Sequence, residues 1–190
     1  MDLKGSQTEK NLLGSFAGES QARNRYTYFA SKAKKEGYEQ IASVFQETAD
    51  QEKEHAKRFF SLLQGGEVMI SAGFPAGEVG TTADNLAASA SGENHEHSIL
   101  YPGFAKIARE EGFAEAAALW DAVSKAEMHH EQRYRALLRN VKEGTVFKKS
   151  GKVKWVCRNC GHVHEGPEAL QVCPACLHPQ SYQQILSETF

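Results

Sequence analysis

The sequence lacks the segments that carry a chain into or across a membrane. No stretch approaches the roughly 20 apolar residues that a membrane-spanning helix needs. The first residues, MDLKGSQTEKNLL, contain no apolar run of the kind found in signal peptides. We therefore expect a cytoplasmic protein that does not bind membranes.

An excess of charge of either sign is also lacking. The 190 residues carry a formal net charge of −2 at pH 7 and contain no basic patch, which argues against nucleic acid as a partner. With 41% hydrophobic residues, the chain is long enough to bury a substantial core. The composition agrees with a mainly helical, globular body.

Cysteine is scarce and unevenly distributed. The four cysteines form two pairs, Cys157-Arg-Asn-Cys160 and Cys173-Pro-Ala-Cys176, with twelve residues between the pairs. Disulfides are unexpected in a chain without a secretion signal, whereas the paired spacing is typical of a tetrathiolate metal site, which accepts zinc or iron. Because so short a segment cannot bury enough apolar surface to fold alone, the metal must contribute much of its folding free energy.

One pattern occurs twice in the sequence. Residues 36–59 and 111–134 superimpose at an offset of 75 without a gap. Each copy contains Glu-x-x-His, a spacing that places a carboxylate and an imidazole on one helix face, where both can bind one metal. Two copies therefore predict one two-metal site. The aligned pairs are Glu52 and Glu127, His55 and His130, and Arg58 and Arg133.

The segment before each copy is repeated too. Glu19 aligns with Glu93 at an offset of 74, whereas Tyr26 aligns with Tyr101 at an offset of 75. Each half is therefore expected to be a helical hairpin whose first helix supplies one Glu and whose second supplies Glu-x-x-His. Four helices that supply these ligands are typical of ferritin-like dimetal-carboxylate bundles.

Glycines mark the limits of the expected helices. A Glu-Gly pair forms the turn of each hairpin, and a glycine-rich stretch over about 65–82 predicts the single long crossover of ferritin-like bundles. We expect a mainly α fold, with a ferritin-like four-helix bundle in residues 1–146 and a small metal-bound β domain in residues 147–190. The expected helices span about 8–36, 38–63, 83–111 and 113–141.

The change of offset predicts an irregularity in the third helix. Glu19 and Tyr26 are seven residues apart, nearly two turns, but Glu93 and Tyr101 are eight apart. In a regular helix the additional residue would rotate Tyr101 by about 100° away from the site. One added residue can be absorbed as a π-bulge, which is frequent at functional sites. We therefore expect a π-bulge between Glu93 and Tyr101.

The stretches AGESQARNRY and ADQEKEHAKR, with Cys-x-x-Cys-Gly and Cys-Pro-x-Cys, make the sequence resemble the rubrerythrins over essentially its whole length. The resemblance implies a ferritin-like di-iron bundle joined to a rubredoxin-like domain with one iron bound by four cysteines. It implies that Glu52 and Glu127 bridge the two irons, and that Tyr26 and Tyr101 hydrogen-bond to ligand carboxylates. By position, the implied di-iron ligands are Glu19, Glu52, His55, Glu93, Glu96, Glu127 and His130, and those of the single iron are Cys157, Cys160, Cys173 and Cys176.

Glu96 has no counterpart in the first half, where Ala22 stands at the matching position. Four carboxylates neutralise two Fe(II) ions, whereas two Fe(III) ions leave positive charge that a fifth carboxylate and an oxygen-derived bridge could offset. The family resemblance implies that one iron exchanges His55 in the reduced state for Glu96 in the oxidised state.

Other polar residues near these patterns are expected to be structural. We expect Arg58 and Arg133 to form ion pairs near the bundle. The remaining histidines have no partner in the repeat, so we expect each of them to be a surface residue or a neighbour of a ligand and not a metal ligand. They are His95, His97, His129, His162, His164 and His178.

The two kinds of iron centre indicate a hydrogen peroxide reductase. Two adjacent irons can bind both oxygens of a peroxide and give up one electron each, which matches a two-electron cleavage of the O–O bond. The tetrathiolate iron changes by one electron and would return two electrons in sequence. An external rubredoxin or NAD(P)H-dependent reductase must supply them, because the chain has no dinucleotide fingerprint.

The resemblance also implies a head-to-tail homodimer. The ten helical residues from His130 to Asn140 already span about 15 Å, so the tetrathiolate centre is carried away from its own di-iron site. We therefore expect electrons to cross from the tail of one subunit to the bundle of the other.

Two other functions stay open. An iron-storage or iron-oxidising protein of the ferritin type would use the same bundle site with dioxygen, although mineral formation needs no electron supply. In a scaffold, zinc at the four cysteines would only stabilise the fold. A visible absorption spectrum would distinguish a zinc scaffold from a protein with iron at the four cysteines, because iron thiolates are red and zinc thiolates are colourless.

Overall fold

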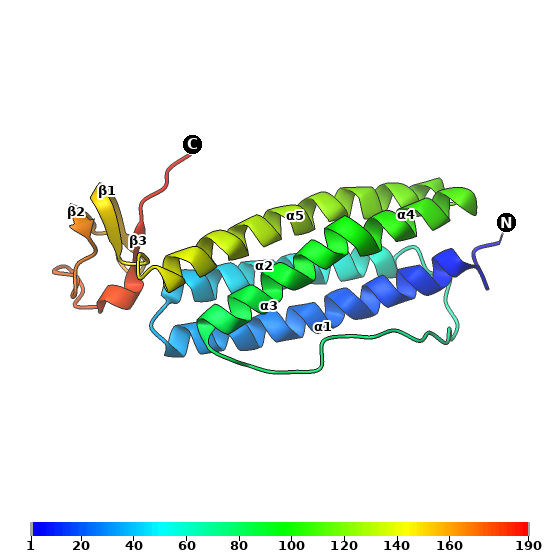
Figure 1. The fold of residues 1–190 in the computed structure, drawn as a ribbon, viewed down its shortest axis with the longest axis horizontal. Coiled ribbons are helices and arrows are strands. Elements are labelled where there is room, and N and C mark those ends of the chain that lie inside the picture. The colour runs from blue at the N-terminus through cyan, green and yellow to red at the C-terminus, as the bar shows by residue number, and fades with distance from the viewer. Residues whose placement is uncertain (1, 190) are drawn as a thin grey trace.

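Four long helical rods lie side by side in the computed structural model, which describes residues 2–189 (Figure 1). Met1 and Phe190, the outer ends of the two predicted domains, lie outside the described residues. The helices are α1 (Gln7–Lys35), α2 (Glu39–Phe60), α3 (Thr82–His95), the π-helix η1 (Glu96–Leu100), α4 (Tyr101–Glu110) and α5 (Ala114–Lys142). Because α3, η1 and α4 follow one another in a single rod, the predicted ferritin-like four-helix bundle is confirmed.

The two hairpins are closed in the same way. The glycines that follow α1 and α4 have φ of +83° and +86°, a conformation that favours glycine. The glutamate before each glycine binds the start of the other hairpin. Glu111 accepts the N–H of Thr8 at 2.8 Å, and Glu36 accepts the N–H of Thr82 at 2.8 Å. Each repeated Glu-Gly pair therefore ends one helix and caps another.

Residues 61–81 join the two hairpins without a helix or a strand. The segment runs along the outside of α1 from the end of α2 to the start of α3 (Figure 1). A capping box between Thr81 and Asp84 then starts α3. The predicted long crossover is confirmed, and α2 ends at Phe60, three residues before the predicted end at Leu63. None of the helices in residues 2–189 has the length and apolarity needed to cross a membrane.

Aromatic side chains fill the bundle on both sides of its middle. Toward the C-terminal domain, the ring of Phe45 lies 6.1 Å from Tyr26 and 5.1 Å from Tyr134, centroid to centroid. On the other side, the rings of Phe59 and Trp120 are 5.8 Å apart. All five side chains are buried. The aromatic core is therefore divided into two parts, one on each side of the middle of the bundle.

The predicted irregularity lies at η1. Its five residues form a π-helix, and the N–H of Tyr101 donates to the carbonyl oxygen of Glu96, five residues earlier. Because the additional residue is absorbed there, Tyr101 remains buried and faces the middle of the bundle, as Tyr26 does. The predicted π-bulge is confirmed.

A three-stranded sheet forms the small C-terminal domain. The central strand β1 (Lys148–Cys157) pairs antiparallel with β2 (Val163–Glu168) and β3 (Gln183–Ile185), and a 3-10 helix, η2 (Gln180–Tyr182), precedes β3. Trp155 of β1 is buried and donates its indole N–H to the carbonyl oxygen of Gly166 at 3.0 Å. The predicted β domain is confirmed.

The C-terminal domain lies at the end of the bundle where α1 turns into α2 (Figure 1). The ring of Phe147 stacks on Tyr38, with centroids 6.2 Å apart. The domain follows the end of α5 at Lys142 and packs against the turn between α1 and α2. The boundary between residues 146 and 147 stays a prediction.

Candidate functional site

Six side chains from all four rods converge in the middle of the bundle. They form two groups, and within each group one ligand atom of every residue lies within 4.8 Å of the others. The groups are Glu19, Glu52, His55 and Glu127, and Glu52, Glu93, Glu127 and His130. Glu52 and Glu127 belong to both groups, so they are placed to bind two cations at once. The structure thus brings together six of the seven predicted bundle ligands.

The imidazoles lie against the shared carboxylates. His55 Nδ1 is 2.9 Å from an oxygen of Glu52 and 2.9 Å from an oxygen of Glu127. His130 Nδ1 is 3.2 Å from Glu52, 2.7 Å from Glu127 and 3.9 Å from Glu93. The two halves of the repeat therefore build a nearly symmetric site, with one imidazole from each hairpin.

Several buried atoms of the site make no hydrogen bond of good geometry within residues 2–189, although some of them lie close to an imidazole or a carboxylate. They are Glu19 Oε2, Glu52 Oε1, Glu93 Oε2, both carboxylate oxygens of Glu127, and His130 Nδ1. Buried polar atoms are nearly always satisfied, because leaving one unpaired costs about 1–3 kcal/mol. Carboxylate oxygen and imidazole nitrogen are ligands of iron. The residues therefore fit a pair of iron ions, one held by each group of ligand atoms.

The electrostatics of the site favour added positive charge. Burial and the charge of Glu52 raise the pKa of Glu19 well above its usual value, and the same two causes raise the pKa of Glu93 to about 8. Burial lowers the pKa of His55, but the nearby carboxylates of Glu127 and Glu52 raise it to about 10. Without metal, the side chains of the site therefore hold protons, which cations displace when they bind.

Each hairpin supplies a tyrosine that bonds to the glutamate of the other hairpin. The hydroxyl of Tyr26 donates to Glu93 Oε1 at 2.5 Å, and that of Tyr101 donates to Glu19 Oε1. Burial, followed by the charge of these carboxylates, raises the pKa of both phenols well above its usual value, so both remain protonated donors. Because each tyrosine occupies one carboxylate oxygen, the second oxygen is left to face a metal.

Glu96 lies outside both groups of ligand atoms. It is the first residue of η1, and its carboxylate makes no hydrogen bond within residues 2–189. Burial and neighbouring carboxylates, Glu93 first among them, raise its pKa well above its usual value, and Arg25 opposes the shift. In the structure His55 completes the group that contains Glu19. The role of Glu96 as a metal ligand stays a prediction.

Two contacts beside the site involve Gln51 and Glu131, which no sequence pattern marks. His130 Nε2 lies 2.9 Å from Gln51 Oε1, so the ring donates from Nε2 and keeps Nδ1 free for a metal. The carboxylate of Glu131 lies 2.5 Å from His97 Nε2. In the repeat an alanine stands opposite both Gln51 and Glu131, so no duplicated pattern pointed to them.

The residues predicted to be structural have structural contacts. Arg58 pairs with Glu115 at 2.7 Å and Arg133 pairs with Glu47 at 2.9 Å, which confirms both ion-pair predictions. None of the six histidines that have no partner in the repeat belongs to a metal-binding group within residues 2–189.

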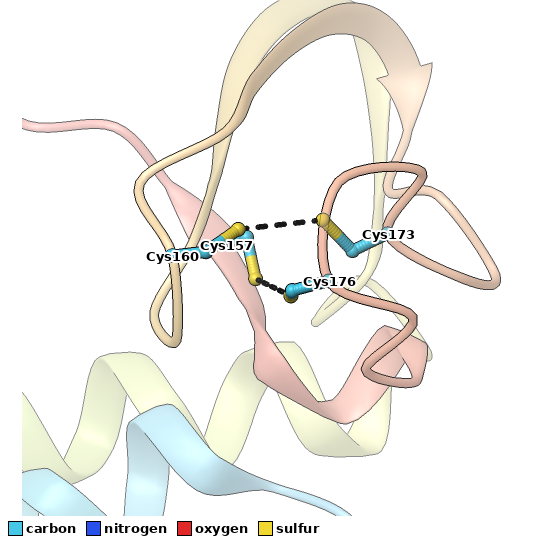
Figure 2. A group of neighbouring side chains, drawn as sticks. All are labelled: Cys157, Cys160, Cys173 and Cys176. Atoms are coloured by element: carbon cyan, nitrogen blue, oxygen red, sulfur yellow. Dashed lines mark hydrogen bonds between the residues drawn. The ribbon is translucent and has the colours of Figure 1, made fainter.

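The second metal site lies in the C-terminal domain (Figure 2). The Sγ atoms of Cys157 and Cys176 are 3.7 Å apart, and those of Cys160 and Cys173 are 3.6 Å apart. Four thiolates about 2.3 Å from a tetrahedral metal lie about 3.8 Å from one another. All four cysteines are free of disulfides. The sulfur positions therefore fit one tetrahedrally bound ion.

Both cysteine pairs form the same turn. The N–H of Gly161 donates to the carbonyl oxygen of Cys157 at 2.8 Å, and that of Leu177 donates to the carbonyl oxygen of Cys173 at 2.9 Å. Gly161 and Leu177 both have positive φ, +78° and +60°. Leu177 thus adopts a left-handed conformation that costs a residue with a side chain about 1–2 kcal/mol.

The fold and the two sites define a class of protein. It is a ferritin-like bundle with a di-metal carboxylate site, joined to a small domain with a tetrathiolate site. The family model described as rubrerythrin matches residues 10–138, and that of the rubrerythrin rubredoxin-like domain matches residues 155–182. The chain belongs to the rubrerythrin family.

Individual relatives agree with this assignment. The rubrerythrin of Porphyromonas gingivalis is 61% identical over 99% of this chain and 94% of its own length, and that of Nitratidesulfovibrio vulgaris is 56% identical over 97% and 96%. A solved structure of fully reduced, all-ferrous nigerythrin is 31% identical, covers 97% of this chain and 91% of its own, and has a TM-score of 0.64. The chain therefore combines a di-iron site with a rubredoxin-like iron site, as an iron-dependent oxidoreductase of this family.

Proposed function

We propose that this chain reduces hydrogen peroxide to water at its di-iron site, with electrons delivered through the four-cysteine iron site. The observation that carries the proposal is that one chain holds both a buried two-metal carboxylate site and a tetrathiolate site. When bound, the adjacent irons supply two electrons for cleavage of the O–O bond, whereas a tetrathiolate iron supplies one electron at a time. Iron storage has no use for the second site.

The protein's own residues hold the site in place for this reaction, which consumes two electrons and two protons for each peroxide. Glu52 and Glu127 belong to both ligand groups, so they fix the separation of the two cations. Tyr26 and Tyr101 keep a proton on their hydroxyl oxygens and hold the two outer carboxylates in orientation. The aromatic core on both sides limits access of water to the site.

We propose that Glu96 replaces His55 as a ligand when the site is oxidised. Oxidation adds one positive charge per iron, and a carboxylate compensates this charge better than a neutral imidazole does. Support comes from the surroundings of Glu96, where burial, and then the carboxylate of Glu93, raise its pKa.

We propose that the small C-terminal domain, called the tail domain below, receives electrons from an external rubredoxin or NAD(P)H-dependent reductase. The tail domain then passes them to the di-iron site of a partner subunit in a head-to-tail homodimer. The position of the tail domain beyond the end of the bundle supports this route (Figure 1). The ten helical residues between His130 and Asn140 alone span about 15 Å.

Rapid mixing of anaerobically reduced protein with either hydrogen peroxide or dioxygen tests the proposed function. We expect peroxide to oxidise the di-iron site faster than dioxygen does at equal concentration. Faster oxidation by dioxygen would overturn the proposal and favour an iron-oxidising protein of the ferritin type. The red absorption of the ferric tetrathiolate serves as an internal signal, because it should follow oxidation of the bundle site.

A further inference from the structure

The π-helical turn η1 packs against the apolar core through Leu100, but few polar side-chain contacts join it to the other rods. Its five residues are all partly exposed as whole residues, although the carboxylate of Glu96, at the first position, is shielded from water. Within residues 2–189, the contact between His97 and Glu131 is the one hydrogen bond or ion pair that joins a side chain of η1 to a different rod. Ser98 bonds only to the backbone of α3. The position of Glu96 therefore depends on what holds the backbone of η1.

Glu131 of α5 is a buried carboxylate surrounded by three donors. Its exposed fraction is 8%. It accepts a hydrogen bond from Asn94 Nδ2 at 3.1 Å and one from Arg135 Nε at 2.6 Å, and His97 Nε2 lies 2.5 Å away. Hydrogen bonds to an ionised group are about twice as strong as those between neutral groups. Glu131 is therefore a firmly held anchor for η1 and the end of α3.

The residues of this network are sequence neighbours of site residues. The adjacent pairs are Glu93 and Asn94, Glu96 and His97, and His130 and Glu131. The network therefore joins the backbone that carries Glu93 and Glu96 to the backbone that carries His130. It does so at the point where the α-helix changes into a π-helix.

The first hairpin has no equivalent network. The positions that match Asn94, His97, Glu131 and Arg135 are occupied there by Ser20, Arg23, Ala56 and Phe60. In that half α1 is an uninterrupted helix, and Ala22 matches Glu96. The network, the π-turn and the additional carboxylate thus occur together, in one half of an otherwise repeated site.

We propose that Glu131 is a positioning residue that fixes η1 against α5 through His97 and Asn94, and so sets the place of Glu96 beside the di-iron site. This inference rests on the proposed role of Glu96 in the oxidised site. Glu131 belongs to neither ligand group, so it acts through the backbone of η1. Without the carboxylate of Glu131, no hydrogen bond or ion pair within residues 2–189 would join a side chain of η1 to another rod.

The test compares Glu131→Gln with Glu115→Gln in iron-loaded protein. The control makes the same chemical change on the same helix, where Glu115 forms an exposed ion pair with Arg58. Loss of hydrogen bonds to an ionised group predicts amide hydrogen exchange in η1 that is faster by roughly tenfold or more in Glu131→Gln, and unchanged in the control. The absorption of the oxidised di-iron site should shift toward that of a Glu96→Gln variant, while the tetrathiolate absorption stays unchanged.

A His97→Gln variant reaches the same contact from η1 and keeps the proposal testable if Glu131→Gln folds poorly. Both variants should shift the exchange and the spectrum in the same direction, and the double variant should show less than the sum of the two shifts, because both break the contact between His97 and Glu131. Unchanged exchange in η1 and an unchanged oxidised spectrum would overturn the proposal, even with lower thermal stability. No readout involves peroxide, so failure of the proposed peroxide reduction would be seen separately.

Discussion

Glu52 and Glu127 each face two metal positions, so the loss of either carboxylate should disturb both bundle metals. We predict that Glu52→Ala binds fewer than two ions in the bundle and keeps the ion of the tail domain. Cys160→Ser should do the opposite and destabilise the tail domain. Metal analysis of protein loaded in vivo checks both outcomes, with Glu54→Ala, an exposed neighbour on α2, as the control. Two bundle ions retained in Glu52→Ala would contradict the bridging role.

Leu177 stands where the matching turn has Gly161, and its side chain is 77% exposed. Replacement by glycine relieves the left-handed strain and gives up almost no packing. We predict that Leu177→Gly stabilises the tail domain by about 1 kcal/mol, reduced somewhat by the greater freedom of glycine in the unfolded chain. The loss of tetrathiolate absorption on heating measures this effect. A lower midpoint than in the wild type would show that Leu177 makes a contact that outweighs its strain.

The predictability of a residue depended on whether the repeat contains it twice. The glutamates and histidines of the ligand groups are duplicated, and the cysteines have a diagnostic spacing, so their positions were predicted before any geometry. Gln51 and Glu131 are aligned with alanines in the other copy of the repeat, and their contacts arise only when separate helices pack together. Sequence spacing within one helix carries no information about such contacts.

At the scale of helices, Glu36 and Glu111 join the two hairpins by capping. Glu111 accepts the N–H of Thr8 and its hydroxyl at 2.6 Å. We predict that Glu111→Gln lowers the free energy of unfolding by about 1 kcal/mol at pH 7, the usual worth of a helix cap. Glu110→Gln is the control, because Glu110 has only a long ion pair with Lys106. Denaturant unfolding of both variants measures the difference.

The stabilisation by Glu111 should depend on pH. Hydrogen bonds, that of the Thr8 hydroxyl first, lower the pKa of Glu111 below its usual 4.5. A carboxylate with a lowered folded-state pKa stabilises the fold fully at pH values above its usual pKa. This stabilisation is lost as the pH falls through the folded-state pKa. The difference in unfolding free energy between wild type and Glu111→Gln should therefore shrink below about pH 4.5. A constant difference down to pH 3 would contradict capping by the ionised carboxylate.

The elements themselves followed from the sequence to different degrees. The π-helix was predictable because Glu19 and Tyr26 differ by seven residues and Glu93 and Tyr101 by eight, which fixes where one residue must be absorbed. The end of α2 was not, because Leu63 continues the apolar pattern while the backbone has already turned after Phe60. Apolar periodicity reports which face is buried and does not report where the hydrogen-bond ladder stops.

At the scale of the whole molecule, the tail domain lies beyond the end of the bundle (Figure 1), and we have proposed that electrons cross between subunits. We predict that two inactive variants complement each other when mixed. One is Cys157→Ser with Cys160→Ser, which lacks the tail iron, and the other is Glu52→Ala with Glu127→Ala, which lacks the bundle site. Heterodimers should recover peroxide reduction driven by an external donor. Heterodimers that form but stay inactive would favour transfer within one chain.

The number of irons oxidised per hydrogen peroxide tests the central claim most directly. Fully reduced, anaerobic protein is titrated with peroxide, and the absorption of the two kinds of centre counts the ferric iron formed. Reduction of peroxide to water predicts two ferric irons for each peroxide consumed, and no trapped hydroxyl radical. One ferric iron for each peroxide, with hydroxyl radical trapped in equal amount, would contradict a peroxide reductase.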